Sequence, residues 1–153
     1  MTPRGTLPGN TTWMQFDWTQ VTTVVPTNLN GFANSRSSID WQLICHAHAH
    51  GARVVAFAPG GTQGAGGAVP TDFQMPLSAN LTLRRQWVTA AVELVRELAL
   101  DGLNFDFESP LNATDPRVGH YAAVIAETRD ALQQVHPRAL KVNILRLAHG
   151  WCT

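Results

Sequence analysis

The sequence of 153 residues lacks several features that would direct it to particular classes of protein. Only 14% of its residues are charged, and 11 basic side chains balance 11 acidic ones. The chain therefore has no excess of positive charge with which to bind nucleic acid or an anionic membrane surface. No apolar run approaches the roughly 20 residues that a membrane span needs. We expect neither nucleic acid nor a membrane as a partner.

Cysteine is also scarce, and this limits the kinds of site that the chain can hold. Cys45 and Cys152 are the only two, too few for a disulfide framework or a cysteine-based zinc site. The segment CHAHAH ends at His50 and raises the question of a metal. On a helix, however, only His46 and His50 share a face, and no carboxylate follows at ligand spacing. We expect no metal and no cofactor.

The amino-terminal residues, MTPRGTLPGN, contain no apolar stretch, so the sequence as it stands predicts no secretory signal peptide. N-x-[ST] sequons nevertheless occur at Asn10, Asn80 and Asn112, which are candidate glycosylation sites. Three sequons in this length favour a history in the secretory pathway. The two observations conflict: either a leader is missing from this chain, or the sequons are never used.

The chain does contain enough apolar material for one folded domain. Hydrophobic residues make up 44% of it, and its length suits a single core better than two. Four compact segments have the composition or the alternation of β-strands, at residues 21–25, 52–59, 103–109 and 141–145. Between them, three- and four-residue periodicity predicts helices at about 39–50, 83–100 and 118–135. Gly51 is well placed to end the first of these helices.

This alternation of strands and helices predicts right-handed βαβ units and a parallel sheet. Doubly wound sheets and (β/α)₈ barrels both begin in this way, and periodicity does not separate them. The strand at 103–109 favours the barrel, because helices would cover one of its faces while the other carries acids. We therefore predict an α/β fold, a partial TIM (β/α)₈ barrel of about four βα units.

The strand predicted at 103–109 alternates strictly between apolar and polar side chains. Its apolar face would carry Leu103, Phe105 and Phe107, and its polar face Asn104, Asp106 and Glu108. Burying carboxylates is costly unless they are paired or hydrogen-bonded. Two carboxylates in unequal surroundings are the usual means of hydrolysing a glycosidic bond. The alternatives are acids bonded to a neighbouring Lys or Arg, or a surface strand in a solvated sheet.

Residues 101–108, DGLNFDFE, resemble the D-G-x-[DN]-x-D-x-E signature on the fourth strand of the family 18 glycoside hydrolases. The form with asparagine at the position of Asn104 resembles a lysosomal branch of that family, whose members act in glycoprotein breakdown. Residues 17–24 and 45–55 also resemble that branch, in its second-strand region and in its next helix and third strand. The likeness covers about residues 12–142, and it implies that the four strands match the second to the fifth of the barrel.

The resemblance implies a substrate-assisted retaining glycosidase for N-acetylglucosamine linkages of chitobiose-type oligosaccharides. Glu108 would be the general acid and base, and Asp106 would hold the acetamido N–H of the substrate. Asn104 would form hydrogen bonds beneath Asp106, whereas Asp101 and Gly102 would serve the turn into the strand. The implied location is the lysosome.

A closed barrel typically needs about 250 residues, so the resemblance implies a partial catalytic domain that spans residues 1–153. Its ends, at 1–11 and 143–153, diverge from the family pattern. We therefore expect a truncated product that lacks the first strand and the last three. Hydrolysis is the implied function, and the alternative is an inactive fragment, at most a carbohydrate- or partner-binding module.

Overall fold

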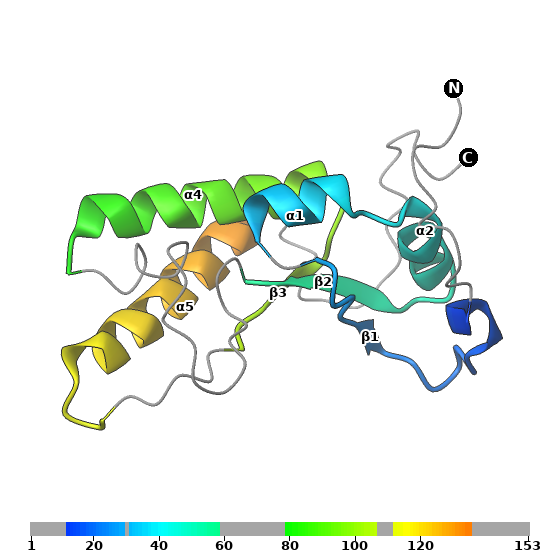
Figure 1. Ribbon diagram of the computed structural model, residues 1–153, viewed down its shortest axis with the longest axis horizontal. Helices are drawn as coiled ribbons and strands as arrows, with labels where there is room; N and C mark the ends of the chain where they lie inside the picture. Colours follow the sequence, from blue (N-terminus) through cyan, green and yellow to red (C-terminus); the bar gives the residue numbers. More distant parts are fainter. Residues whose placement is uncertain (1–11, 30, 59–78, 107–111, 136–153) are drawn as a thin grey trace.

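The computed structural model describes residues 12–29, 31–58, 79–106 and 112–135. The elements in chain order are η1 (Thr12–Gln15), β1 (Thr23–Val24), α1 (Phe32–Ser37), α2 (Trp41–Ala49), β2 (Arg53–Phe57), α4 (Leu81–Glu97), β3 (Gly102–Asn104) and α5 (Pro116–Val135). The three strands form a parallel sheet in the order β1-β2-β3 (Figure 1). The described residues therefore have an α/β fold of successive βα repeats.

The strands lie where the sequence predicts them, but they are shorter. The segments 21–25 and 52–59 contain β1 and β2, and 103–109 overlaps β3. β3 ends at Asn104, which pairs in register with Phe57, the last residue of β2. The prediction that the strand continues through Asp106 is therefore wrong. The strand predicted at 141–145 and the residues from 107 to 111 lie outside the described residues.

The three predicted helices correspond to α2, α4 and α5. α1 was not predicted, because its six residues, FANSRS, offer no apolar repeat. α1 is held by a tertiary contact, because the ring of Phe32 packs against that of Trp87 on α4 with centroids 6.2 Å apart. No described helix is both long and apolar enough to cross a membrane.

Well-formed caps define both ends of α2. The Asp40 side chain accepts hydrogen bonds from the backbone N–H groups of Gln42 (3.0 Å) and Leu43 (3.1 Å). At the other end the Ala52 N–H donates to the Ala47 carbonyl (2.9 Å), one of the two hydrogen bonds of a Schellman motif. Gly51 has φ +76°, so it provides the left-handed residue that this motif needs. The predicted end of the helix is confirmed.

The carboxyl end of α4 repeats this motif, but with an alanine in the left-handed position. The Leu100 N–H donates to the Val95 carbonyl (2.9 Å) and the Ala99 N–H to the Arg96 carbonyl (3.3 Å). Ala99 has φ 50°. A residue with a Cβ pays a steric penalty in this conformation. α2 and α4 thus end alike, each leading directly into the next strand.

Replacing Ala99 by glycine is expected to raise the free energy of unfolding by about 1 kcal/mol. The steric penalty of the left-handed region disappears, and the greater freedom of glycine in the unfolded chain offsets part of the gain. Urea denaturation followed by circular dichroism measures the change. In the control Ala90→Gly, inside α4, the same substitution should instead lower stability by about 1 kcal/mol. A loss of stability at both positions would contradict the prediction.

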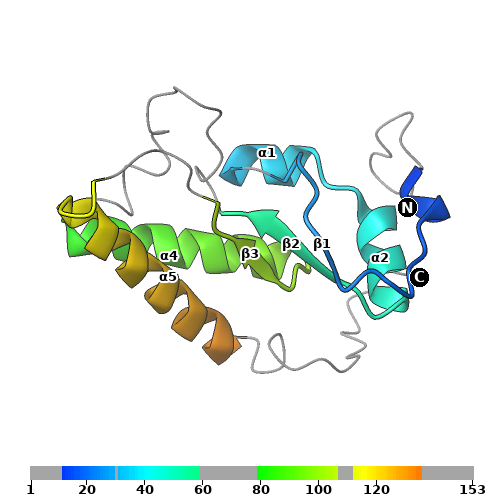
Figure 2. The same cartoon turned by 90° about the horizontal axis from the view of Figure 1, so that it is seen from below.

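The helices α2, α4 and α5 pack on the same buried side chains of the sheet, and Figure 2 shows α4 and α5 lying along one side of the strands. This face receives Val54 and Ala56 from β2 and Ala58 just after it, all with 0% exposure. One core cluster joins β2 to α2 and the end of α4, and a second joins Trp87 on α4 to Val124 on α5. The other face of the sheet therefore belongs to the alternate side chains of each strand.

A buried ion pair ties α4 to α5. Arg84 is only 8% exposed, and its Nε and Nη2 atoms donate to both carboxylate oxygens of Glu127 at 2.7–3.1 Å. The hydrogen bond from Arg84 holds the pKa of Glu127 below its ordinary value, and the same contact raises the pKa of Arg84. The Glu127 side chain is 38% exposed, so solvent screens part of this attraction.

Replacing Glu127 by glutamine is expected to cost about 1–2 kcal/mol near neutral pH, because the buried Arg84 guanidinium loses its ionised partner. Since the pKa of Glu127 is lowered in the folded state, its contribution is present above the unfolded value of about 4.5. The contribution is lost as the pH falls through the lowered folded value. Urea titrations at about pH 7 and about pH 3 should therefore show a larger difference between the two proteins at the higher pH than at the lower.

The matched control for this prediction is Glu97→Gln. Glu97 also accepts a hydrogen bond from an arginine, Arg36, at 2.8 Å, but both side chains are exposed, at 51% and 41%. This exposed pair should contribute little at either pH. An equal loss of free energy of unfolding in both glutamate variants would mean that the burial of Arg84 does not make its ion pair more stabilising.

Candidate active site at the carboxyl end of the sheet

The side chains around β3 separate into two faces. Leu103 packs against both core clusters beneath the helices. Phe105 continues on that side: its ring centroid lies 6.0 Å from that of Trp87 and 6.2 Å from that of Tyr121. Asn104, between them, belongs by alternation to the opposite face, and Asp106 follows two residues later. This opposite face is called the inner face below.

Asn104 is held at the end of the sheet by the backbone. Its carbonyl accepts a hydrogen bond from the Ala58 N–H at 2.8 Å, and its Cα is in register with that of Phe57. Asn104 and Asp106 are both half-buried. Glu108 lies outside the described residues, so its pairing with Asp106 stays a prediction. The structure thus describes two members of the predicted polar row, Asn104 at the end of β3 and Asp106 two residues beyond it.

Asp101 and Gly102 lie at the other end of β3. One Asp101 carboxylate oxygen contacts His48 Nε2 at 2.9 Å and accepts the Val54 N–H at 2.7 Å, and the Asp101 N–H donates to the Val54 carbonyl at 2.8 Å. Asp106 lies five positions after Asp101, which is about 16 Å along an extended chain. Asp101 therefore joins α2, β2 and β3 far from the predicted acids. Gly102 faces Val55, whose Cγ1 would lie 3.8 Å from an added Cβ.

Sequence reasoning missed the aromatic neighbour of Asn104. Phe57 pairs in register with Asn104, and the cross-strand neighbours of a parallel sheet point to the same side. Phe57 is half-buried and is absent from both core clusters of the described residues. The signal was present in RVVAF, where Val55 and Phe57 alternate with the buried Val54 and Ala56. The inner face therefore offers an apolar ring beside the polar row.

The histidines of α2 are packing residues in the described structure. The rings of His46 and His50 lie 4.3 Å apart, and that of His46 meets Trp13 at 5.1 Å and Trp18 at 5.0 Å. His48 points elsewhere, toward Asp101. Both tryptophans are buried, at 8% and 6% exposure, so they belong to the core rather than to a sugar site. Among the described residues no three histidine, cysteine or acidic side chains gather as metal ligands would.

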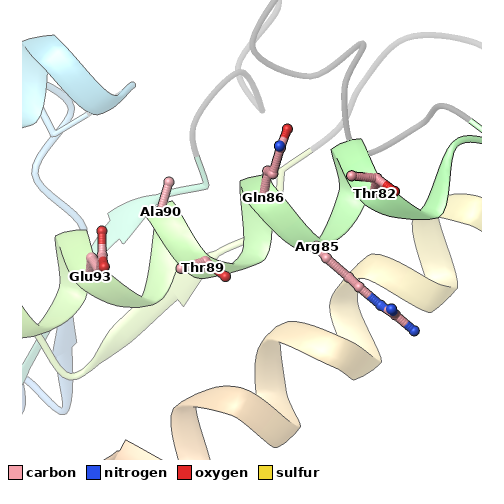
Figure 3. A pocket seen from close by; sticks show the side chains of 6 residues that line it. All are labelled: Thr82, Arg85, Gln86, Thr89, Ala90 and Glu93. Atoms are coloured by element: carbon pink, nitrogen blue, oxygen red, sulfur yellow. The ribbon is translucent and has the colours of Figure 1, made fainter.

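A shallow hollow runs along the outer face of α4 (Figure 3). Its lining comes from a single face of this helix: Thr82, Arg85, Gln86, Thr89, Ala90 and Glu93. The face that packs on the sheet carries Trp87, Val88 and Ala91 instead. In Figure 3 Arg85 and Glu93 point away from each other. The hollow has no convergent polar groups and lies on the side of α4 away from the sheet, so it is not a candidate active site.

The candidate glycosylation sites fall at helix starts. Asn80 is the N-cap of α4, and Asn112 precedes α5 by four residues; both are exposed. Asn10 lies outside the described residues.

Cys45 on α2 is disulfide-bonded, a role that the count of two cysteines did not suggest.

Comparison with curated proteins finds relatives that are named di-N-acetylchitobiases. The chain is 29% identical to that of Mus musculus over 126 residues, which make up 82% of this chain and 28% of the mouse protein. It is 33% identical to that of Bos taurus over 80% of this chain and 58% of the bovine protein. It is 27% identical to "Probable di-N-acetylchitobiase 2" of Dictyostelium discoideum, over 84% of this chain and 28% of that protein. No family model and no solved structure matches it.

Proposed function

We propose that the chain, a homologue of the di-N-acetylchitobiases over about four fifths of its length, is a glycosidase of N-acetylglucosamine linkages in chitobiose-type oligosaccharides. The chain spans 28% of the mouse relative and 58% of the bovine one, so an activity of the whole relatives comes to it only as a proposal. The partial (β/α)₈ barrel, the assignment to glycoside hydrolase family 18 and a lysosomal location belong to the same proposal.

One observation carries the proposal: the two faces around β3. Leu103 and Phe105 pack under the helices, so Asn104 and Asp106 are left to the inner face at the carboxyl end of the sheet. In βα barrels this end holds the active site. Continued alternation would place Glu108 on the same side, one step nearer the edge. Phe57 beside Asn104 would supply apolar surface for a sugar ring and limit the access of water.

The proposed reaction uses the substrate's own acetamido group as nucleophile, an exception to the usual pair of protein carboxylates. Glu108 donates a proton to the glycosidic oxygen as the bond from C1 to that oxygen breaks. The acetamido carbonyl oxygen bonds to C1 and forms an oxazolinium ion, while Asp106 accepts the acetamido N–H and stabilises the positive charge. Glu108 then takes a proton from water, whose oxygen bonds to C1 as the bond from C1 to the acetamido oxygen breaks, which opens the oxazolinium ring and restores the acetamido group.

A second candidate function is binding of the sugar without hydrolysis. It is favoured by the inner face, where Phe57 pairs in register with Asn104, so that an apolar ring and a polar side chain could both contact a sugar. Such a chain would act as a carbohydrate- or partner-binding module.

The test is hydrolysis of a chromogenic chitobioside by the purified chain. Release of the chromophore, together with no release from the analogue that carries a hydroxyl in place of the acetamido group, would support the substrate-assisted glycosidase. Equal turnover of both substrates would exclude the proposed mechanism. Heat of binding to chitooligosaccharides without any turnover would support the binding module instead.

A further inference from the structure

We propose that Asn80 and Asn112 carry N-linked oligosaccharides in the folded protein, on the edge of the sheet near which Asp106 lies. This inference does not depend on the proposed glycosidase activity. It depends on the exposure of the two asparagines, on the hydrogen bonds of their side chains and on where the two helices begin.

At Asn80 the side-chain oxygen has a structural task that glycosylation would leave intact. Oδ1 accepts hydrogen bonds from the backbone N–H groups of Thr82 (2.9 Å) and Leu83 (3.3 Å), and so caps α4. An oligosaccharide attaches through the amide nitrogen and preserves the carbonyl oxygen. Both residues of the sequon that are recognised, Asn80 and Thr82, are exposed. The cap and the modification are therefore compatible on one side chain.

Asn112 repeats this arrangement ahead of α5. Its Oδ1 accepts from both the backbone N–H and the hydroxyl of Thr114, each at 3.2 Å, and both residues are exposed. The helix itself begins with Pro116, and Asp115 accepts the Arg117 N–H at 2.9 Å. In both sequons the asparagine oxygen thus bonds to the residue that bears the hydroxyl, two positions along the chain. An attached sugar would extend from the surface rather than into the core.

The topology places both asparagines at one edge. Strands β2 and β3 are parallel, and α4 connects them, so the amino end of α4 lies at the carboxyl end of the strands. α5 follows β3 and begins at the same end. Figures 1 and 2 both show the starts of α4 and α5 at the same end of the molecule. The two oligosaccharides would therefore border the edge that holds Asp106.

The disulfide at Cys45 supports the compartment that this modification requires. Disulfides persist in oxidising surroundings such as the endoplasmic reticulum, where lipid-linked oligosaccharides are transferred to sequons. In that transfer the asparagine Nδ2 bonds to C1 of the oligosaccharide and loses one proton. The bond from C1 to the lipid pyrophosphate breaks, and the pyrophosphate leaves with the lipid.

The experiment expresses the full chain behind a cleavable secretory leader in cultured eukaryotic cells, with Asn10→Gln to silence the third sequon. Intact mass is measured before and after peptide N-glycosidase, on secreted and retained protein alike. Two oligosaccharides are expected, with one lost in Asn80→Asp, one in Asn112→Asp and both in the double variant. A mass without sugar, or one unchanged by either variant, would overturn the proposal.

A second readout tests whether the sugars fit the folded protein. Peptide N-glycosidase converts each modified asparagine to aspartate. Since the carboxylate of aspartate also caps a helix, the treated protein keeps both caps. Treated and untreated protein should unfold at the same temperature by circular dichroism. The variant Thr82→Ser preserves the sequon and should retain the oligosaccharide on Asn80. The variant Thr82→Ala destroys the sequon and should lose that oligosaccharide. A glycosylated protein that melts well below the treated one would show that these positions do not accept sugar in this fold.

Discussion

Replacing Glu108 by glutamine is expected to lower the rate of chitobioside hydrolysis by about 10²–10⁴-fold, the usual weight of a general acid. Glutamine has nearly the shape of glutamate but holds no transferable proton, so the leaving oxygen would depart as an anion. Binding of the oligosaccharide should change much less, because the amide can still accept and donate hydrogen bonds. Initial rates with the chromogenic substrate and calorimetric titration of an unreactive oligosaccharide measure the two effects separately.

The control for this experiment is Glu93→Gln, on the exposed outer face of α4, away from the sheet. It makes the same chemical change and should leave the rate as it is. Equal rates for the wild-type chain and the Glu108 variant would remove Glu108 from the mechanism. A similar fall in both variants would point to a general loss of folded protein rather than to a lost acid.

Replacing Trp87 by alanine is expected to cost about 3–5 kcal/mol of stability, the range for removing a large aromatic side chain from a core. Trp87 is only 1% exposed and is the largest fully buried side chain among the described residues. Its ring meets Phe32 of α1 at 6.2 Å and Phe105, beyond β3, at 6.0 Å. Since domains are stable by only about 5–15 kcal/mol, the variant should lose a large share of the free energy of unfolding.

Urea denaturation followed by far-ultraviolet circular dichroism measures this loss without relying on tryptophan fluorescence. Trp87→Phe should lose less, because the smaller ring still fills much of the site. Phe16→Ala removes an aromatic side chain that is 50% exposed and should cost less than about 1 kcal/mol. A cost of under 1 kcal/mol for the alanine variant of Trp87 would show that the ring is not a central support of the core.

Features carried by local periodicity could be predicted from the sequence. The alternation after Asp101 correctly separated Leu103 and Phe105, which face the helices, from the polar side chain between them. The turn at Gly51 was equally local, since glycine adopts the left-handed conformation without penalty. Trp87 lies within the helix predicted at about 83–100 and is 1% exposed, as an apolar residue of such a periodic pattern should be.

Features that depend on residues far apart in the sequence could not be predicted. Asp101 meets His48 across 53 positions, and no spacing rule connects a turn before one strand with the last turn of an earlier helix. α1 lacks an apolar repeat and is held by contact with α4. Ala99 adopts a left-handed conformation that favours glycine, and an alanine gives no sign in the sequence that the helix ends there. Two cysteines, in turn, form no pattern from which the bond at Cys45 could be deduced.

The carboxylate that joins α2, β2 and β3 also bears on the order in which the chain assembles on the ribosome. Val54 emerges 47 residues before its partner Asp101, and parallel pairing of the strands needs the whole of α4 between them. Before β3 has been synthesised, one edge of β2 has no neighbouring strand. Such an unpaired edge can pair with strands of other nascent chains. Slow synthesis between residues 58 and 101 would lengthen the interval in which this edge is exposed.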